Sequence, residues 1–358
     1  MIIVSPKWIY LNNSKLEMDK SILIDGPIII DILDNETIQK KYKEISRIEY
    51  PNHVLMPTFT ESYLNSNNCQ TKKDVESKIK SLLKNGVTRL CVHGNNYKDI
   101  MNIDIAELDI AHIIELDGKT INQADIKNMT NVLDFYKSDS SKQFCISLNN
   151  IIDFDKKTII KLMSILNEID MNLYIKGSCL QNISDKEKIN DLISFWSEIN
   201  LIDNSYLHGF LGLNNYWKSN LQKRNIIVMI SYEELLSVDN IMKFLYLHQN
   251  KMKCLLVTET FNSYDFYGII KLIEKLDINQ NNIFDKDKII NCVTDNASSL
   301  FPNLISTGSI KKGNKASFNL FNYTSNQLLE NKDCIPKLSI LDKQSLTHVW
   351  SAGELYKV

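Results

Sequence analysis

Short apolar runs fill the first 56 residues of the chain. Residues 1–11 (MIIVSPKWIYL), 21–33 (SILIDGPIIIDIL) and 46–57 (SRIEYPNHVLMP) are rich in apolar and β-branched residues, and Asn, Asp and Gly stand between them. Runs of this kind, bounded by turn residues, are typical of β-strands. The Asp25-Gly26 pair predicts a tight turn, because Asp-Gly readily adopts the backbone angles of a two-residue hairpin loop. The pattern therefore predicts a β-rich unit at this end of the chain.

From about residue 57, helical and strand-like patterns alternate. Residues 72–86 have the apolar spacing of a helix that ends at Gly86, and the apolar run 87–94 follows; the same order recurs at 155–177, 184–213, 214–231 and 238–259. Strands that are apolar throughout and alternate with helices indicate a parallel sheet covered on its faces. So many units in about 250 residues favour a (β/α)8 barrel over an open doubly wound sheet. The absence of a Gly-rich phosphate loop after any predicted strand agrees with this choice.

The helical spacing stops after about residue 304. Residues 306–325 (STGSIKKGNKASFNLFNYTS) and 345–358 (SLTHVWSAGELYKV) have the composition of strands joined by Gly turns. Strand-rich segments on both sides of a barrel predict that the two ends of the chain pair in one small β-sandwich. The predicted domains are a β-sandwich subdomain made of residues 1–56 and 305–358, and a barrel made of residues 57–304.

Composition narrows the classes of function. The chain has 358 residues, 44% of them hydrophobic and 23% charged, as expected of a globular protein with a large core. Its formal net charge of −2 offers no electrostatic attraction to nucleic acid or to acidic membranes, and we expect neither as a partner. The seven Cys are scattered without a CxxC pair, which favours reduced thiols. With no export signal and no apolar run near ~18 residues, we expect a soluble, cytoplasmic protein.

Three segments resemble motifs of the amidohydrolase superfamily. Residues 53–65 (HVLMPTFTESYLN) resemble a junction whose pattern is Val-(Leu/Met)-Pro-Gly-Phe-(Ile/Val)-Asn-Ala-His-x-His. Residues 306–323 resemble the closing motif Gly-x-Ile-x-x-Gly-Lys-x-Ala-Asp, and residues 345–358 resemble the last hairpin. The opening residues 5–33, together with 111–118 (AHIIELDG), resemble the cyclic-deaminase branch, and within it the aminofutalosine deaminases of menaquinone synthesis. The resemblance implies a barrel that hydrolyses a C–N bond other than a peptide bond.

The resemblance also implies a metal site at the carboxyl ends of the barrel strands. In the family, the ligands are the two His of His-x-His after strand 1, a His on strand 5, a His on strand 6 and an Asp on strand 8. Imidazole and carboxylate ligands of this kind hold a divalent ion and leave one position open for water. The ion lowers the pKa of that water to about 7, which supplies hydroxide at neutral pH.

Most of the corresponding positions in this chain hold other residues. They are Tyr63 and Asn65 for His-x-His, Lys176 for the strand 5 His, Cys179 for the Glu that follows it in deaminases, His208 for the strand 6 His, and Glu259 for the Asp. His208 and Glu259 supply two ligands, whereas a catalytic zinc normally needs three from the protein. We therefore expect no bound cofactor; the alternative is one divalent Zn or Fe ion that uses His208 and Glu259.

Charge balance predicts a partner for Glu259. Without an ion, this carboxylate would be uncompensated at the top of the barrel, and the ammonium of Lys176 could stand where the metal charge is in the family. The alternatives remain open at each position. Lys176 could form a Schiff base, and Cys179 is a nucleophile or an inert buried thiol. His208 is a leftover ligand or a structural residue.

Further residues at predicted strand ends are candidates for ligand binding. His93 ends the run 87–94, and Glu115 lies in the segment 111–118. Both point toward the predicted barrel mouth and join Tyr63 and Asn65 as candidates to contact a small molecule. The structural alternative for His93 and Glu115 is packing or the capping of a loop.

Two classes of function are compatible with these residues. The first is a catalytically inactive homologue with a binding or regulatory role, which takes a small-molecule ligand and forms a homo-oligomer or pairs with an active relative. The second is an active hydrolase or deaminase that acts on a C–N bond of a purine-type molecule through an atypical metal site or without metal. Metal content distinguishes the two classes.

Overall fold

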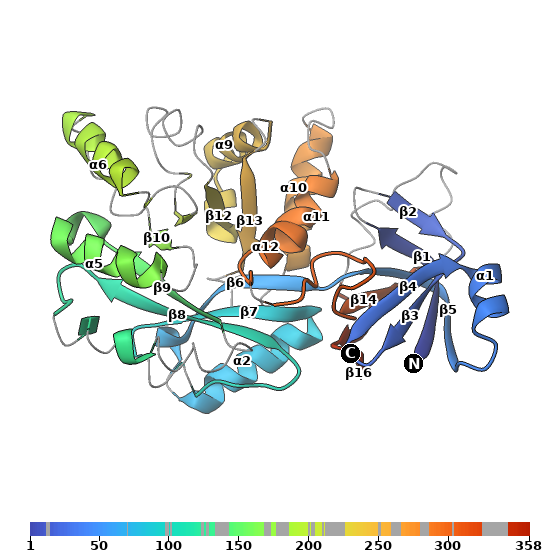
Figure 1. The fold of residues 1–358 in the computed structure, drawn as a ribbon. Helices are drawn as coiled ribbons and strands as arrows, with labels where there is room; N and C mark the ends of the chain where they lie inside the picture. The colour runs from blue at the N-terminus through green and yellow to red at the C-terminus, as the bar shows by residue number, and fades with distance from the viewer. Residues whose placement is uncertain are drawn as a thin grey trace.

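The computed structural model contains two β-sheets that lie side by side (Figure 1). It describes residues 1–11, 15–69, 71–96, 100, 102–122, 125–126, 129–132, 143–167, 173–176, 186–199, 201, 205–209, 211, 226–249, 252–258, 266–279, 286–302, 304–323 and 343–358. One sheet is a parallel barrel, and the other is built from strands at both ends of the chain, so that the N- and C-termini lie in the same small unit.

The barrel sheet contains eight described strands in sequence order. They are β6 (Phe59–Asn65), β7 (Val87–Gly94), β8 (Asp109–Asp117), β9 (Gln143–Asn149), β10 (Tyr174–Lys176), β11 (Tyr206–His208), β12 (Ile227–Ser231) and β13 (Lys253–Val257). Each strand pairs in parallel with the next along the chain. Strand β7 is buried along its whole length, as expected of a strand covered on both faces. The (β/α)8 barrel predicted from the alternation of patterns is confirmed.

Most of the described helices lie between strands of the barrel sheet, several of them where the spacing of apolar residues predicts a helix, and the helix within the first 56 residues contacts strands of the other sheet. The described helices are α1 (Asn35–Lys41), α2 (Lys72–Lys84), α5 (Lys156–Asn167), α6 (Lys186–Glu198), α8 (Tyr232–Leu235), α9 (Val238–Gln249), α10 (Phe266–Asn279), α11 (Lys286–Val293) and α12 (Asp295–Ser298). The helix predicted within residues 214–224 lies outside the described residues. None of the described helices combines the length and apolar character that crossing a membrane requires.

Helix α2 shows how the sequence fixes these units. Thr71 caps its first turn through a reciprocal pair of hydrogen bonds with Asp74, which satisfies backbone N–H groups that have no partner inside the helix. Val75, Ile79 and Leu82 form its buried face. This face packs on the barrel because three residues spaced by three or four positions lie on one side of a helix.

The interior of the barrel is a packed core of alternate side chains from the strands. Its buried members are Tyr63, Cys91, Ala111, Ile113, Cys145, Tyr174, Tyr206, Ile227, Met229, Leu255 and Val257. Ala297 of α12, with Leu300 and Phe301 after it, packs against these side chains. Filling of this kind is typical of barrels, whose centre is a core and not a pore.

A buried carboxylate joins the first and last strands of the barrel. Glu61 on β6 is fully buried and accepts the backbone N–H of Thr258, which follows β13, at 3.2 Å. The Thr258 hydroxyl donates to the same carboxylate oxygen, and the backbone N–H of Tyr63 donates to the other at 2.9 Å. Because these donors come from both sides of the seam, Glu61 holds β6 and β13 together.

The second sheet combines both ends of the chain. Its strands are β1 (Ile2–Leu11), β2 (Lys15–Met18), β3 (Lys20–Asp25), β4 (Ile28–Asp34), β5 (Arg47–Pro57), β14 (Phe318–Asn322), β15 (Leu346–Ser351) and β16 (Glu354–Lys357). The order β16-β15-β14-β5-β1-β3-β4 makes it one continuous sheet, and β2 pairs with β1. The bridge between Ile28 and Lys315 brings the segment before β14 against β4. The sheet therefore curls around its own apolar core, which gives the predicted sandwich-like subdomain.

Both predicted glycine turns are present. Gly26 has a φ of +52° in the turn between β3 and β4, and Ala352 and Gly353, with φ of +53° and +86°, join β15 to β16. In the β15–β16 hairpin, positive φ at both central residues matches the right-handed twist of the two flanking strands. In the β3–β4 hairpin the two loop residues are Gly26 and Pro27, because Asp25 still pairs with Ile28, so the turn lies one residue later than the predicted Asp25-Gly26 pair.

Polar side chains connect the subdomain to the barrel. Asn319 on β14 donates from its side chain to the carbonyl oxygen of Gly86, just after α2, at 3.0 Å. Arg89 is fully buried and donates to Asp109 at 3.1 Å, and Lys315 from the other unit pairs with the same Asp109 carboxylate. The buried charge of Arg89 is paired with that of Asp109, and this pairing offsets the free energy that removing the two charges from water costs.

Gly86 provides a test of this junction. Its φ of +85° is unfavourable for any other residue, and an added Cβ would lie 2.5 Å from the Asn319 side chain. We expect Gly86→Ala to lower the free energy of unfolding by about 2–4 kcal/mol through backbone strain plus the clash. Gly313→Ala is the control, because Gly313 has a φ of +86° with no atom within 4 Å of an added Cβ, and about 1 kcal/mol is expected. If urea unfolding shows that both variants lose the same free energy of unfolding, the contact with Asn319 does not contribute at Gly86.

A histidine pair in the subdomain predicts acid sensitivity. The rings of His53 on β5 and His348 on β15 lie 6.2 Å apart, each 5.3 Å from the ring of Tyr50. Burial, and then the charge of His348, lower the pKa of His53 from 6.5 to about 4. The unfolded chain therefore takes up a proton at a higher pH than the folded chain does. Stability present above pH 6.5 is lost as the pH falls toward 4.

We expect this half-buried ring to contribute on the order of 1 kcal/mol of that loss, after allowance for solvent screening. Urea unfolding of the native chain and of His53→Gln at pH 7, 6 and 5 measures it. The variant should lose less stability than the native chain over this range. If the native chain and His53→Gln lose the same free energy of unfolding between pH 7 and pH 5, the imidazole of His53 is not the titrating group.

Candidate functional site

The predicted site residues lie at the carboxyl ends of neighbouring barrel strands. Tyr63 is on β6, His93 on β7, Glu115 on β8, Lys176 on β10 and His208 on β11. Because the strands are parallel, these ends meet at one face of the barrel, the face on which barrel active sites are built. Lys176 and His208 are direct register partners on adjacent strands.

The carboxylate of Glu115 is the centre of the site. Its Oε1 atom accepts the Tyr63 hydroxyl at 2.7 Å and lies 2.7 Å from the ammonium nitrogen of Lys176. The Nδ1 atom of His93 lies 3.6 Å from the same oxygen. The Asn67 side-chain amide donates to Oε2 at 3.2 Å. Groups from four different segments of the chain therefore converge on one carboxylate, which we call the Glu115 cluster.

The ammonium of this cluster lies over an aromatic ring that itself packs against other rings. The Nζ atom of Lys176 lies 4.7 Å from the centre of the Tyr63 ring, a distance at which a cation is attracted to the ring face. The ring of Tyr63 is also 4.0 Å from that of His93 and 4.9 Å from that of His208. Tyr174 makes an edge contact with His93 at 5.0 Å. This packing fixes Lys176 as a positioned cation.

Charge and burial fix the ionisation of Glu115. Its side chain is 3% exposed, and that of Lys176 is 22% exposed. Burial by itself would raise the pKa of Glu115, but hydrogen bonding and charge from His93 and Lys176 lower it by more. The pKa of Glu115 therefore lies well below its ordinary range, and the carboxylate is charged at neutral pH. The amine of Lys176 is engaged in an ion pair with this carboxylate, whereas a Schiff-base nucleophile needs a neutral amine that is available to attack.

The other predicted positions are placed differently. The side-chain oxygen of Asn65 accepts the backbone N–H of Asn67 at 2.9 Å and caps the short helix η1 (Ser66–Asn68). Cys179 and Glu259 lie outside the described residues. The predicted Lys176–Glu259 pair therefore stays a prediction, and within the described part of the chain it is Glu115 that pairs with Lys176.

The donors that the structure describes at this face do not by themselves form a site for a hydrolytic metal ion. No group of three or more His, Cys, Asp or Glu in the described part of the chain has the arrangement to hold one. The rings of His93 and His208 both contact the Tyr63 ring, and the Glu115 carboxylate is already bound by Lys176 and Tyr63. An ammonium 2.7 Å from the carboxylate is also a repulsive neighbour for a second cation.

Sequence patterns did not single out Asn67 or Glu61. Asn67 lies in an Asn-rich loop and carries no distinguishing signal. Glu61 does carry a signal in the sequence, because it is the acidic residue within the apolar segment 53–65. A charge inside a buried strand needs partners, so this position alone predicts a structural carboxylate.

Comparisons with known proteins agree with the architecture. No protein-family model matches the chain, and no curated protein sequence matches it. Among solved structures, an adenosine deaminase from Xanthomonas campestris with bound zinc is 12% identical, with a TM-score of 0.78, over 100% of this chain and 93% of that one. The Helicobacter pylori aminofutalosine deaminase in complex with methylthio-coformycin is 12% identical, with a TM-score of 0.78, over 99% of this chain and 100% of that one. A guanine deaminase from C. acetobutylicum with bound guanine is 12% identical, with a TM-score of 0.79, over 99% of each chain.

The chain has the fold of these deaminases. The fold that the resemblance to amidohydrolases implies is therefore confirmed. Because one fold supports many activities, the chemistry must be argued from the side chains at the barrel mouth.

The Glu115–Lys176 pair can be tested by stability. We expect Glu115→Gln to lower the free energy of unfolding by about 1–3 kcal/mol, because it removes the negative charge that lies against a largely buried ammonium. The double variant Glu115→Gln/Lys176→Met should recover part of that loss. Glu76→Gln is the control, since Glu76 pairs with Lys72 at 3.7 Å on the surface, and about 0.5 kcal/mol or less is expected. Additive losses in urea unfolding of the single and double variants would rule out the coupling.

Proposed function

We propose that this chain is a small-molecule-binding protein on a deaminase-type barrel and does not activate water with a metal ion. The supporting observation is the contact of 2.7 Å between Lys176 and Glu115. This contact puts the positively charged side chain of Lys176 at the face of the barrel where a hydrolytic metal ion would be needed. The role is binding or regulation, as expected when the fold remains and the ligand set does not.

Electrostatics supports this proposal. Lys176 already neutralises the Glu115 carboxylate, so the pair attracts a divalent ion much less than an unpaired carboxylate would. Strong ligands would have to supply the remaining free energy of metal binding. Tyr63 and Asn65, which replace the paired His of the family, are weak ligands for zinc at neutral pH. These residues therefore favour the ammonium of Lys176 over a divalent metal ion at this position.

Two cavities beside the Glu115 cluster support a binding role. One, of about 360 Å³, lies between the loops that follow β6 and β7 and includes Asn67 in its wall. The other, of about 180 Å³, is lined by Glu115 itself, with Asn95 and Asp117. Small-molecule sites in barrels occur at this face and are concave, and the larger cavity has the size of a ligand pocket.

Metal content and hydrolysis test the proposal together. We expect protein purified without chelator to contain far less than one equivalent of Zn, Fe, Ni or Mn by mass spectrometry. Added zinc should not raise its Tm, since a ligand that does not bind the folded chain does not stabilise it. No ammonia should be released from adenosine or guanine. Near-stoichiometric metal in the native chain would overturn the proposal.

A variant with restored ligands provides the comparison. Tyr63→His/Asn65→His/Lys176→His removes the ammonium and adds three imidazoles at the same strand ends. Zinc at about 100 times its Kd should stabilise this variant by about 2.7 kcal/mol. Ammonia release by metal-free native protein would instead favour the alternative function, a hydrolase with an atypical site.

A further inference from the structure

Apolar side chains are exposed on the outer face of α8 and α9. α8 contacts β12 and α9 contacts β13, so the two helices lie on the outside of the barrel (Figure 1). Leu236, directly after α8, is 58% exposed, and Met242 and Tyr246 on α9 are 49% and 43% exposed. Met242 and Tyr246 are four residues apart, so they are neighbours on the helix surface. We call these three residues the α9 patch.

The inner face of α9 is apolar as well. It packs into the main hydrophobic core with side chains that are at most 7% exposed, namely Ile241, Phe244, Leu245 and Leu247. A helix that is apolar on both faces is normally covered on both. Helix α2 gives the contrast, because its outward positions hold Lys73, Ser77 and Lys80, as expected of a helix that faces water. The outer face of α9 therefore has the composition of a covered surface.

The other exposed large apolar residues in the described part of the chain are spread over different elements. Ile160 is 51% exposed, and among the described residues of α5 it is the exposed large apolar one. Single residues of this kind are normal on a protein surface and need no partner. Several on neighbouring turns, in contrast, are typical of a surface that another molecule covers.

Two charged residues of opposite sign lie beside the α9 patch. Asp239 is in the first turn of α9, and Lys243 follows one turn later and pairs with it. The side chain of Asp239 is 73% exposed, so its carboxylate can accept a second partner without losing the first. Along the chain the order is apolar Leu236, acidic Asp239, basic Lys243 and apolar Tyr246.

This order is self-complementary when two copies of α9 pack antiparallel. The pairs Asp239/Lys243 and Leu236/Tyr246 have the same midpoint in the sequence. A two-fold axis at that midpoint places Asp239 opposite the partner's Lys243, and Leu236 opposite the partner's Tyr246. Met242 lies next to the axis and meets the same residue of the partner. Each contact is then made twice, as a two-fold interface requires, and the two helix dipoles are antiparallel, which is the favourable direction.

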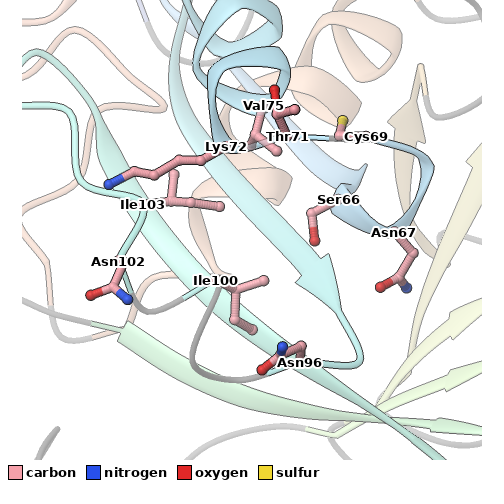
Figure 2. A pocket seen from close by; sticks show the side chains of 10 residues that line it. All are labelled: Ser66, Asn67, Cys69, Thr71, Lys72, Val75, Asn96, Ile100, Asn102 and Ile103. Atoms are coloured by element: carbon pink, nitrogen blue, oxygen red, sulfur yellow. The ribbon is translucent and has the colours of Figure 1, made fainter.

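We propose that the α9 patch forms the interface of a homodimer, in which α9 packs antiparallel against α9 of a second copy of this chain. The order of charges favours a second copy as the occupant, because one helix supplies both the acidic and the basic half of each contact. The inference goes beyond the proposed function and does not depend on it. The cavity lining that Figure 2 shows lies between Ser66 and Ile103, outside α8 and α9.

Analytical ultracentrifugation tests this interface. At about 50 µM we expect the native chain to sediment as a dimer and to dissociate on dilution, as mass action requires. Met242→Glu places a carboxylate next to the same carboxylate of the partner and should raise the Kd of the dimer at least about tenfold. Ile160→Glu is the matched control, because it adds the same charge at an equally exposed apolar position on α5, and it should leave the Kd unchanged.

Charge variants test the antiparallel arrangement. Asp239→Lys makes both positions basic and Lys243→Asp makes both acidic, so like charges face each other across the axis in either variant. Each variant alone should dimerise at least about tenfold more weakly than the native chain. An equimolar mixture of the two should form heterodimers about as strongly as the native chain, since every basic position then faces an acidic one. A fluorescent label on one variant measures this association.

The mixture separates contact between copies from an effect within one helix. The ion pair between positions 239 and 243 is broken in both variants and stays broken in the mixture, so recovered association can come only from the partner's charge. A native chain that is monomeric at about 50 µM would overturn the proposal. A dimer that Met242→Glu does not weaken would place the interface elsewhere and overturn it too. Charge variants that stay monomeric when mixed would overturn the antiparallel arrangement.

Discussion

Glu115 is a charged carboxylate that solvent hardly reaches, and the arrangement of the barrel mouth depends on how that charge is balanced. Lys176 supplies the balancing cation, and Tyr63 and Asn67 donate the hydrogen bonds that a buried carboxylate requires. An ammonium differs from a metal ion in the relevant respect, because it neutralises charge without binding and acidifying a water molecule. The same contact therefore balances the buried charge without supplying a metal-bound water.

Buried carboxylates are placed at both ends of the barrel. At the opposite end, Asp109 is held between Arg89 of β7 and Lys315 of the segment before β14. Glu61 joins the first and last strands between these two levels. Each carboxylate has donors from segments far apart in the chain, so each contact closes a long loop and fixes the geometry that the apolar core alone leaves free.

A concave face lies at the carboxyl ends of the barrel strands, with cavities next to the Glu115 cluster. In the resemblance to amidohydrolase motifs, three of the metal-ligand positions fall on Tyr63, Asn65 and Lys176. A binding site depends on shape and hydrogen bonds, whereas metal hydrolysis depends on a specific ligand set, so substitution can remove the second and leave the first.

The sequence by itself determined the barrel. The spacing of apolar residues alternates between that of a helix and that of a strand, and this alternation does not depend on which residues form the loops. It also predicted, from the resemblance of residues 53–65 to the amidohydrolase junction, that Tyr63 and Asn65 stand where the family has His-x-His, and this stays a prediction. Only the tertiary structure decided that Lys176 meets Glu115, across the intervening strand β9, and that Asn65 turns to cap a loop while Tyr63 faces the interior. The physical reason is that strand spacing gives the face on which a side chain lies, whereas its partner across the barrel depends on strand tilt, on side-chain length and on which charge lies within about 4 Å.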